Sequence, residues 1–368
     1  MADSRRAMTI KDVAAAAGVG VATVSRVLSG QGSVSPRTRE RVLAAAQRLD
    51  YRPSALGRSL KLQRTGSIGL VLPDITDPFY AALAGGVLDC ARTLGEHVIL
   101  DVAHDDPARE AEIVDRLMEQ RVDGIIALPV GRPDGAPAAD LAGGDGAAWQ
   151  AAVRVGLAVV FADRGLAELP EVPTVLADDG AGVRSVVEYL VGLGHRRIGF
   201  LGGSGAGMPG GTALGVRETA FRETLRNLRV PADDDLVVAA RSSRDSAYAA
   251  AASLFQRRPD VTAVLAAGHL LGEAAVLAAR ELNLRVPADV SIAMVDDVPW
   301  AELCDPPLTA VARPAADMGY RACEVLLRDR TRRERGRPVV LPTELVVRGS
   351  CGPPAGTGGT AGRSARTR

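Results

Sequence analysis

Apolar residues recur at helical spacing near the N-terminus, and the first such run lies in residues 9–29. Its apolar positions come at intervals of three and four residues: Ile10, Val13, Ala14 and Ala17. Thr9 can cap this helix, and Asp12 stands three residues later, as in a capping box. Gly18 permits a tight turn, because glycine adopts backbone angles that other residues avoid. The pattern therefore predicts a short capped helix that ends in a turn.

A second helix is predicted from about Val21 to Leu28, directly after that turn. The apolar residues expected to face inward are Val24, Val27 and Leu28. The residues expected to face outward are Val21, Ala22, Ser25 and Arg26, with Thr23 beside them. Two helices of this size around a glycine-containing turn form a helix-turn-helix unit, whose second helix enters the major groove of DNA by its N-terminal residues.

A third helix is predicted after Ser35, which is a good N-cap, and Pro36, which is a good first helical residue. Its apolar stripe consists of Val42, Leu43, Ala46 and Leu49. Three such helices could also form a plain bundle with no role in nucleic-acid binding.

The distribution of charge favours DNA binding over a plain bundle. The chain has 44 Lys and Arg against 44 Asp and Glu. Residues 1–64 hold 12 of the basic and 4 of the acidic residues, which leaves 32 against 40 in residues 65–368. Positive charge gathered in one small helical domain is the electrostatic signature of a DNA-binding protein.

The rest of the chain alternates apolar strand-like runs with helical runs. The predicted strands are 67–72, 98–102, 124–128, 158–161, 198–202, 263–266 and 290–295. The predicted helices between them include 79–94, 108–120, 181–193 and 272–282. This alternation predicts parallel sheets with crossover helices. With 47% hydrophobic residues, the length favours two lobes, each with its own core.

Several short motifs occur in order along residues 8–350. Those near the N-terminus are TIKDVA (9–14), AGV (17–19), ATVSRVL (22–28), YRP (51–53) and RSL (58–60). Those further on are PDI (73–75), RVDG (121–124), LGHRRI (193–198), VP (286–287), PLT (307–309) and RGS (348–350). In these motifs and their order the chain resembles the LacI/GalR family of bacterial transcriptional regulators.

The resemblance implies an α/β architecture with four parts. We expect an all-α helix-turn-helix domain in residues 1–52, followed by a hinge in residues 53–65 that becomes helical on DNA. Residues 66–350 would form a two-lobed core like that of periplasmic sugar-binding proteins, which binds an effector and mediates dimerisation. Residues 351–368 are expected to be a disordered tail. The implied function is that of a cytoplasmic repressor, which binds a pseudo-palindromic operator as a homodimer under the control of a small molecule.

The expected DNA contacts lie on the second helix and in the hinge. Arg26 can make a bidentate contact to guanine, whereas Val21 and Ala22 can only pack on thymine methyls or sugars. Thr23 and Ser25 suit phosphates. The further residues assigned to DNA binding are Thr9, Ser35, Arg58 and Leu60. By resemblance, Leu60 would wedge into the minor groove and kink the duplex, and Gly57 would leave the hinge disordered without DNA.

The expected effector residues follow predicted strands, where open α/β sheets bind ligands. By resemblance they are Phe79, Tyr80, Asp163, Arg217, His269 and Asp296. Aromatic faces with carboxylates and an arginine suit a polyhydroxylated ligand such as a sugar. Many relatives carry Asn-Asp where this chain has Gly268 and His269, so a smaller sugar, a sugar phosphate, another metabolite or no effector stays open. His269 is either a satisfied surface histidine or a ligand contact.

Two other functions deserve comparison. Residues 205–210 match G-x-G-x-x-G, which would suggest a nucleotide-dependent enzyme, but Pro209 lacks the amide hydrogen that a pyrophosphate needs. An exported solute-binding protein would need a signal segment, and neither an apolar signal segment nor 18 consecutive apolar residues occurs. The four cysteines have no metal-ligand spacing and fit reduced thiols. We therefore expect no enzymatic activity, no cofactor, no metal and no membrane partner.

Overall fold

The computed structural model describes residues 8–29, 33–51, 64–130, 146–203, 213–240, 243–329 and 338–355. The chain divides into two compact units, residues 1–66 and 67–368. The predicted Arg58 and Leu60 contacts, the predicted hinge apart from residues 64 and 65, and the glycine motif at 205–210 lie outside the described residues.

The described residues of the N-terminal unit form three helices, α1 (Ile10–Ala17), α2 (Val21–Ser29) and α3 (Pro36–Arg48). The capping box between Thr9 and Asp12 is present, and Gly18 ends α1 in the left-handed conformation with φ 62°. The three helices share a small apolar core: Val13, Ala14, Ala17, Val24, Val27, Val42, Ala45 and Ala46. The predicted stripe of α3 was wrong at Leu43, which is 49% exposed, because Ala45 faces the core instead.

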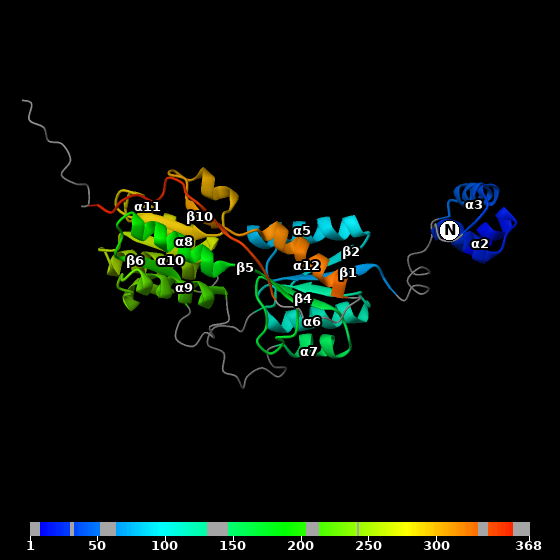
Figure 1. Cartoon of the computed structure of the whole chain (residues 1–368), viewed down its shortest axis with the longest axis horizontal. Coiled ribbons are helices and arrows are strands. Elements are labelled where there is room, and N and C mark those ends of the chain that lie inside the picture. The colour runs from blue at the N-terminus through cyan, green and yellow to red at the C-terminus, as the bar shows by residue number, and fades with distance from the viewer. Residues whose placement is uncertain are drawn as a thin grey trace, which may run out of the picture. The chain divides into compact units, whose positions relative to one another are not determined.

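The second unit contains two six-stranded sheets, each the centre of one lobe (Figure 1). The strands of lobe 1 lie in the order β11-β5-β4-β3-β1-β2, and those of lobe 2 in the order β12-β10-β9-β8-β6-β7. All strand pairs are parallel except β10 with β12. The strands of lobe 1 are β1 (Ser67–Leu72), β2 (His97–Val102), β3 (Ile125–Ala127), β4 (Val159–Ala162), β5 (Thr174–Ala177) and β11 (Val339–Leu341). Those of lobe 2 are β6 (Ile198–Gly203), β7 (Val237–Ala239), β8 (Ala263–Ala266), β9 (Ser291–Val295), β10 (Thr309–Ala312) and β12 (Glu344–Val346).

Helices cover both faces of each sheet, as expected for parallel strands. In lobe 1, α5 (Pro78–Leu94) and α12 (Ala315–Asp329) pack on one face, and α6 (Pro107–Glu119) and α7 (Ala147–Arg154) pack on the other (Figure 1). The helices of lobe 2 are α8 (Asp179–Gly192), α9 (Ala213–Asn227), α10 (Arg244–Arg257) and α11 (His269–Glu281). Two short 3₁₀ turns, Asp234–Leu236 and Pro299–Leu303, complete the lobe.

The chain crosses between the lobes three times. The crossings run from β5 to α8, from β10 to α12, and from β11 to β12. The first and third are tied together, since the Asp178 amide donates to the Leu341 carbonyl at 2.8 Å and the Thr343 hydroxyl donates to the Asp178 carbonyl at 3.0 Å. The crossings therefore bring residues from distant parts of the sequence to the junction of the lobes.

Residues 131–149 are rich in Gly, Ala, Asp and Pro, which predicts a surface loop. The end of this range belongs to α7 instead, where Trp149 is 1% exposed and donates from Nε1 to Glu110. The start of the expected tail is ordered, because the Gly352 carbonyl accepts hydrogen bonds from His195 and Ser291. These contacts tie the start of the predicted tail to lobe 2.

Candidate functional site

The second helix of the N-terminal unit presents the side chains that were predicted to face outward. Val21, Ala22 and Arg26 are exposed, and Thr23 and Ser25 are half-buried. The Arg26 Nε atom donates to the Ala22 carbonyl at 3.4 Å, a bond within the same helix. Since Val24 and Val27 are buried in the core, rotation of α2 is fixed and its polar side faces away from the bundle.

Thr9 and Ser35 both cap helices. The Thr9 hydroxyl donates to Asp12 Oδ2 at 2.7 Å, and the Ser35 hydroxyl oxygen accepts from the Thr38 amide at 3.3 Å. Both residues are exposed, at the N-termini of α1 and α3. A helix N-terminus carries partial positive charge and suits a phosphate, so these two caps fit a role against a DNA backbone.

The turn between α1 and α2 is held by α3. Arg41 donates from Nη2 to the Ala17 carbonyl at 2.5 Å and to the Gly18 carbonyl at 3.5 Å. These carbonyls end α1 and have no partner within that helix. Arg41 therefore fixes the turn that orients α2.

In the second unit, charged residues gather at the carboxyl ends of the strands. Asp163 follows β4 and has φ 67°, and Asp296 follows β9 and has φ 74°. Their backbone amides donate to the carbonyls of Val175 and Val311, which fixes each of them against a neighbouring strand. Non-glycine residues with positive φ are uncommon and concentrate at functional sites.

Arg313 lies at the centre of this group, with its side chain 3% exposed. It donates from Nη2 to Asp163 Oδ1, from Nε to Asp179 Oδ1 at 2.8 Å and from Nη1 to Asp296 Oδ1 at 3.2 Å. Its guanidinium carbon also lies 4.0 Å from the centroid of the Phe79 ring. Burial alone would raise the pKa of Asp163, but Arg313 and the other nearby arginines hold it below the ordinary value.

Arg217 extends this group within lobe 2. It donates from Nε to Asp179 Oδ2 at 2.8 Å and from Nη1 to the Ala267 carbonyl at 2.5 Å. Asp179 thus accepts from two arginines, one on each oxygen. The buried charges are paired and hydrogen-bonded, as buried charges must be.

Tyr80 is hydrogen-bonded to an arginine of lobe 1, Arg164, which follows Asp163 in the chain. Arg164 donates from Nη2 to the Tyr80 hydroxyl oxygen at 2.9 Å. Burial raises the pKa of Tyr80 to about 12 against the opposing effect of Arg164, so the phenol is neutral near pH 7. Tyr80 is therefore available as a neutral hydrogen-bonding group beside Asp163.

His269 faces lobe 1 from the first turn of α11. Its Nδ1 atom lies 3.8 Å from Asp77 Oδ2, across the junction of the lobes. Burial raises the pKa of Asp77 although His269 opposes the shift. The interpretation of His269 as a surface histidine was wrong, because the residue is buried.

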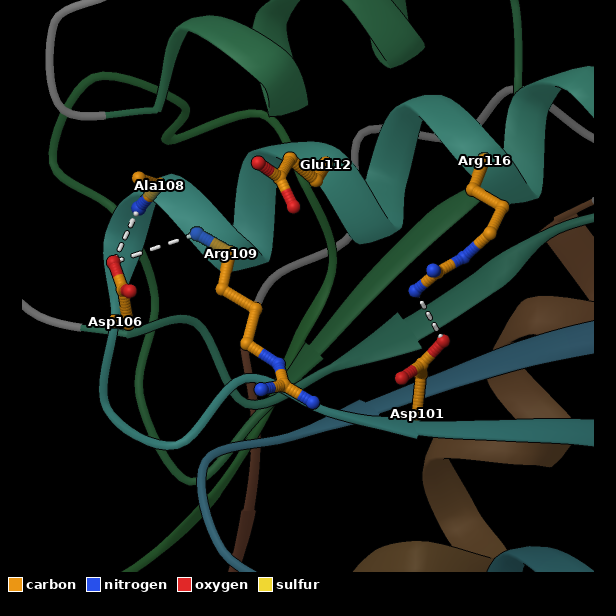
Figure 2. Close-up of a pocket in the computed structure, with 6 residues that line it drawn as sticks. All are labelled: Asp101, Asp106, Ala108, Arg109, Glu112 and Arg116. Atoms are coloured by element: carbon orange, nitrogen blue, oxygen red, sulfur yellow. Dashed lines mark hydrogen bonds and ion pairs between the residues drawn. The ribbon is translucent and has the colours of Figure 1, made fainter.

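A cavity of about 430 Å³ opens beside Arg313. It is bounded by the starts of α5 and α12 and by the loop after β9, with Phe79, Asp296 and Arg313 in its wall. A separate polar pocket lies between β2 and α6, where Arg116 pairs with Asp101 at 2.6 Å (Figure 2). The two pockets have no lining residue in common. The buried ion pairs of Arg313 lie at the cavity beside Arg313 and not at the pocket between β2 and α6.

Sequence reasoning missed Arg313 and Asp179, the two residues with most ion pairs in this group. Arg313 directly follows the short strand β10, and Asp179 comes two residues after the end of the short strand β5. Neither strand was predicted. A search for the charged residue directly after each strand would have found Arg313 after β10, but after β5 it would have found Asp178 and not Asp179. Phe79, Asp163 and Asp296 contact Arg313 directly, and Arg217 joins them through Asp179.

Over the residues that the structure describes, no cluster of His, Cys, Asp and Glu is arranged to hold a metal ion. Within those same ranges, the helices are too short or too polar to cross a membrane.

Comparison with known proteins relates both units to the same kind of protein. Residues 9–54 match the family described as bacterial regulatory proteins of the lacI family, and residues 187–351 match a periplasmic binding protein-like domain. The HTH-type transcriptional regulator DegA of Bacillus subtilis is 35% identical over 94% of this chain and 98% of its own length. A Lac repressor dimer bound to operator and the anti-inducer ONPF is similar in structure, with a TM-score of 0.80, 25% identity, and coverage of 94% of this chain and 100% of that chain. A complex of the regulator CelR with cellobiose has a TM-score of 0.67 and 33% identity, and covers 93% of this chain and 99% of that chain.

Proposed function

Because the chain belongs to the LacI family of bacterial transcriptional regulators, we propose that it represses transcription by binding a pseudo-palindromic operator as a homodimer. It is a DNA-binding regulator and not an enzyme. The observation that carries the proposal is the exposed outer side of α2, in a capped helix-turn-helix whose surrounding 64 residues hold 12 basic and 4 acidic residues.

Base recognition is assigned to Arg26 and to the start of α2. A bidentate contact from an arginine to guanine discriminates by about 1–3 kcal/mol, while Val21 and Ala22 would pack on thymine methyls. Thr23 and Ser25, with the caps Thr9 and Ser35, would hold phosphates and set the register of the helix in the groove. From the sequence alone, Arg58 and Leu60 are assigned to the hinge contact, with Leu60 inserted in the minor groove.

The homodimer follows from the relatives. The Lac repressor structure that this chain resembles is a dimer on its operator. A two-fold dimer presents two recognition helices to half-sites related by the same symmetry, so the operator should be a pseudo-palindrome. The cytoplasm is the proposed location, because the DNA partner lies there in bacteria.

The effector site is assigned to the junction of the lobes. The relatives include a regulator in complex with cellobiose and repressors of ribose operons. In this chain, Phe79, Tyr80, Asp163, Arg217, His269 and Asp296 are the proposed contacts for a sugar or a related metabolite. Since residues of both lobes meet there, a ligand in the cleft would change the relative stability of closed and open lobes and so the operator affinity.

The test is selection of bound sequences from a random DNA pool by the full chain. An enriched sequence with two inverted half-sites supports the proposal, and a pool without an enriched sequence would overturn it. Operator affinity measured with a panel of sugars and related metabolites, at fixed salt, then tests the effector assignment. An effector is expected to change operator affinity by about 5–150-fold.

A further inference from the structure

The guanidinium of Arg313 is bound in the manner of a ligand. Each of its three nitrogen atoms donates to a different carboxylate, from Asp163, Asp179 and Asp296. One face lies against the Phe79 ring, with 4.0 Å between the guanidinium carbon and the ring centroid. Carboxylates in the plane and an aromatic ring on the face are the two ways in which proteins recognise a guanidinium.

These partners are also the groups assigned to an effector. Asp163 and Asp296 would accept hydrogen bonds from a ligand, and Phe79 would pack on its ring. We propose that Arg313 is a tethered ligand of this cleft, and that an external ligand that takes its place carries a guanidinium or amino group. The inference rests on the proposed function in that it concerns the same effector site.

Charge excludes a neutral sugar as the group that displaces Arg313, although not as a ligand that binds while Arg313 stays in place. Without Arg313, three buried carboxylates would face two arginines, Arg217 and Arg164. Arg217 hydrogen-bonds only Asp179 among the three, and Arg164 hydrogen-bonds Tyr80. Hydroxyl groups could replace the hydrogen bonds of Arg313 but would leave a buried carboxylate without a counter-charge, which is strongly unfavourable. A small cation with N–H groups would supply both the hydrogen bonds and the counter-charge that Arg313 provides.

The cavity beside Arg313 offers a small cation a route to the carboxylates. Its volume is about 430 Å³, and its wall includes Arg313, Phe79 and Asp296. Two further carboxylates line the same opening, those of Asp317 and Asp297, and Asp297 is paired with Arg348. The Asp317 carboxylate therefore favours the approach of a cation over that of a neutral molecule.

The test is chemical rescue of an Arg313→Ala variant of the full chain by methylguanidinium. Thermal unfolding is followed at constant ionic strength, with sodium replacing the cation in the reference samples. We expect methylguanidinium at millimolar concentration to raise the variant's Tm by about 3 °C or more, with saturation, and to leave the Tm of the parent chain unchanged. Glucose is expected to raise the variant's Tm much less.

Arg258→Ala is the matched control variant. Arg258 also bonds two carboxylates, at 2.6 Å to Asp233 and 3.0 Å to Asp260, but each of these two side chains is 40% exposed and neither lines the cavity beside Arg313. Water can solvate those carboxylates, so no saturable rescue is expected. An Arg313→Ala/Asp163→Asn double variant should lose most of the rescue.

The proposal is overturned if methylguanidinium fails to stabilise the Arg313 variant, if it stabilises the parent chain or Arg258→Ala equally, or if glucose stabilises the variant as much. If Arg313→Ala does not fold, Arg313→Gln takes its place with the same expected results. Operator binding by the parent chain is measured separately. Its loss would contradict the proposed function, whereas absent rescue with intact operator binding contradicts only the assignment of Arg313.

Discussion

Asp179 and Arg313 join two of the three segments on which the chain crosses between the lobes, with 2.8 Å between Asp179 Oδ1 and Arg313 Nε. Asp179 is the first residue of α8 and is separated from β5 by Asp178 alone, and Arg313 directly follows β10. The other oxygen of Asp179 accepts from Arg217 at 2.8 Å. A single carboxylate therefore holds an arginine of the crossing and an arginine of lobe 2 in place.

Asp179→Asn should destabilise the second unit by about 3 kcal/mol, because removing one partner of a buried ion pair leaves the others without a counter-charge. Urea unfolding followed by circular dichroism measures the change. The matched control is Asp89→Asn, which breaks the pair with Arg92 on α5, where the two side chains are 68% and 77% exposed. The control should change stability by less than about 0.5 kcal/mol, and equal effects of the two substitutions would contradict the structural role of Asp179.

Gly86→Ala should destabilise lobe 1 by more than about 3 kcal/mol or prevent its folding. A Cβ atom at Gly86 would lie 1.8 Å from the Ala316 carbonyl oxygen, and one at Gly319 would lie 1.9 Å from that of Leu83. At both positions the nearest atoms belong to the backbone of the facing helix, so the clash cannot be relieved by moving a side chain. Gly85→Ala on the same helix has nothing within 4 Å and should be neutral or stabilising, by up to about 1 kcal/mol. Thermal unfolding of both variants checks the contrast, and equal melting temperatures would contradict the close packing of α5 on α12.

His195 should make stability fall on mild acidification. The ring is buried, its Nε2 donates to the Gly352 carbonyl at 2.9 Å, and its Nδ1 lies 2.9 Å from the Thr262 hydroxyl oxygen. Burial lowers the pKa of His195 from the ordinary value of 6.5, so below pH 6.5 the unfolded chain takes up the proton more readily than the folded chain. The stabilisation is present above pH 6.5 and is lost as the pH falls through the lowered pKa of the folded state.

His195→Gln should remove that part of the pH dependence. Urea unfolding from pH 7.5 to 5.5 is expected to show a shallower loss of stability in the variant than in the parent, although the variant is less stable at pH 7.5. Other buried acids, such as Asp77 and Glu110, are common to both chains and cancel in the comparison. A variant that loses stability as steeply as the parent would assign the effect to another group.

Local sequence signals predicted the N-terminal unit in detail because its structure depends on short-range rules. Caps at Thr9 and Ser35 and a left-handed Gly18 fix the helix ends, and each acts within a few residues. Leu43 was wrongly predicted to be buried, because helical spacing alone does not determine whether Leu43 or Ala45 faces the core. The packing of α1 against α3 determines it.

In the second unit, buried strands such as β1 and β8 were predicted at their observed bounds, because continuous apolar runs are specific to parallel strands. The strands β7, β11 and β12 were not predicted, whereas β3, which is equally short, lies in the longer predicted apolar run 124–128. The pairing of β7, β11 and β12 is set by distant partners. Trp149 lies at the end of a segment rich in glycine and alanine, so composition gave no sign that it packs against Phe161, with ring centroids 5.6 Å apart.

The proposed effector residues were expected at the ends of strands, but the sequence did not predict that Asp163 and Asp296 form ion pairs with the same arginine. The charges of Asp163 and Asp296 could be located as residues after apolar runs, whereas their shared partner Arg313 stands 150 and 17 residues away in sequence. Such contacts depend on how the three crossings bring the lobes together, and no local pattern contains that information.

Recognition of specific DNA by α2 is tested by the substitution Arg26→Ala. Binding of parent and variant to the selected operator and to a scrambled duplex of equal length is measured by fluorescence anisotropy at 150 mM salt. The parent should prefer the operator by about 10³-fold or more. Arg26→Ala should lose about 5- to 150-fold on the operator, from the 1–3 kcal/mol of a bidentate contact, with little change on the scrambled duplex. Equal binding of the parent to both duplexes, or an unchanged preference in the variant, would contradict the account.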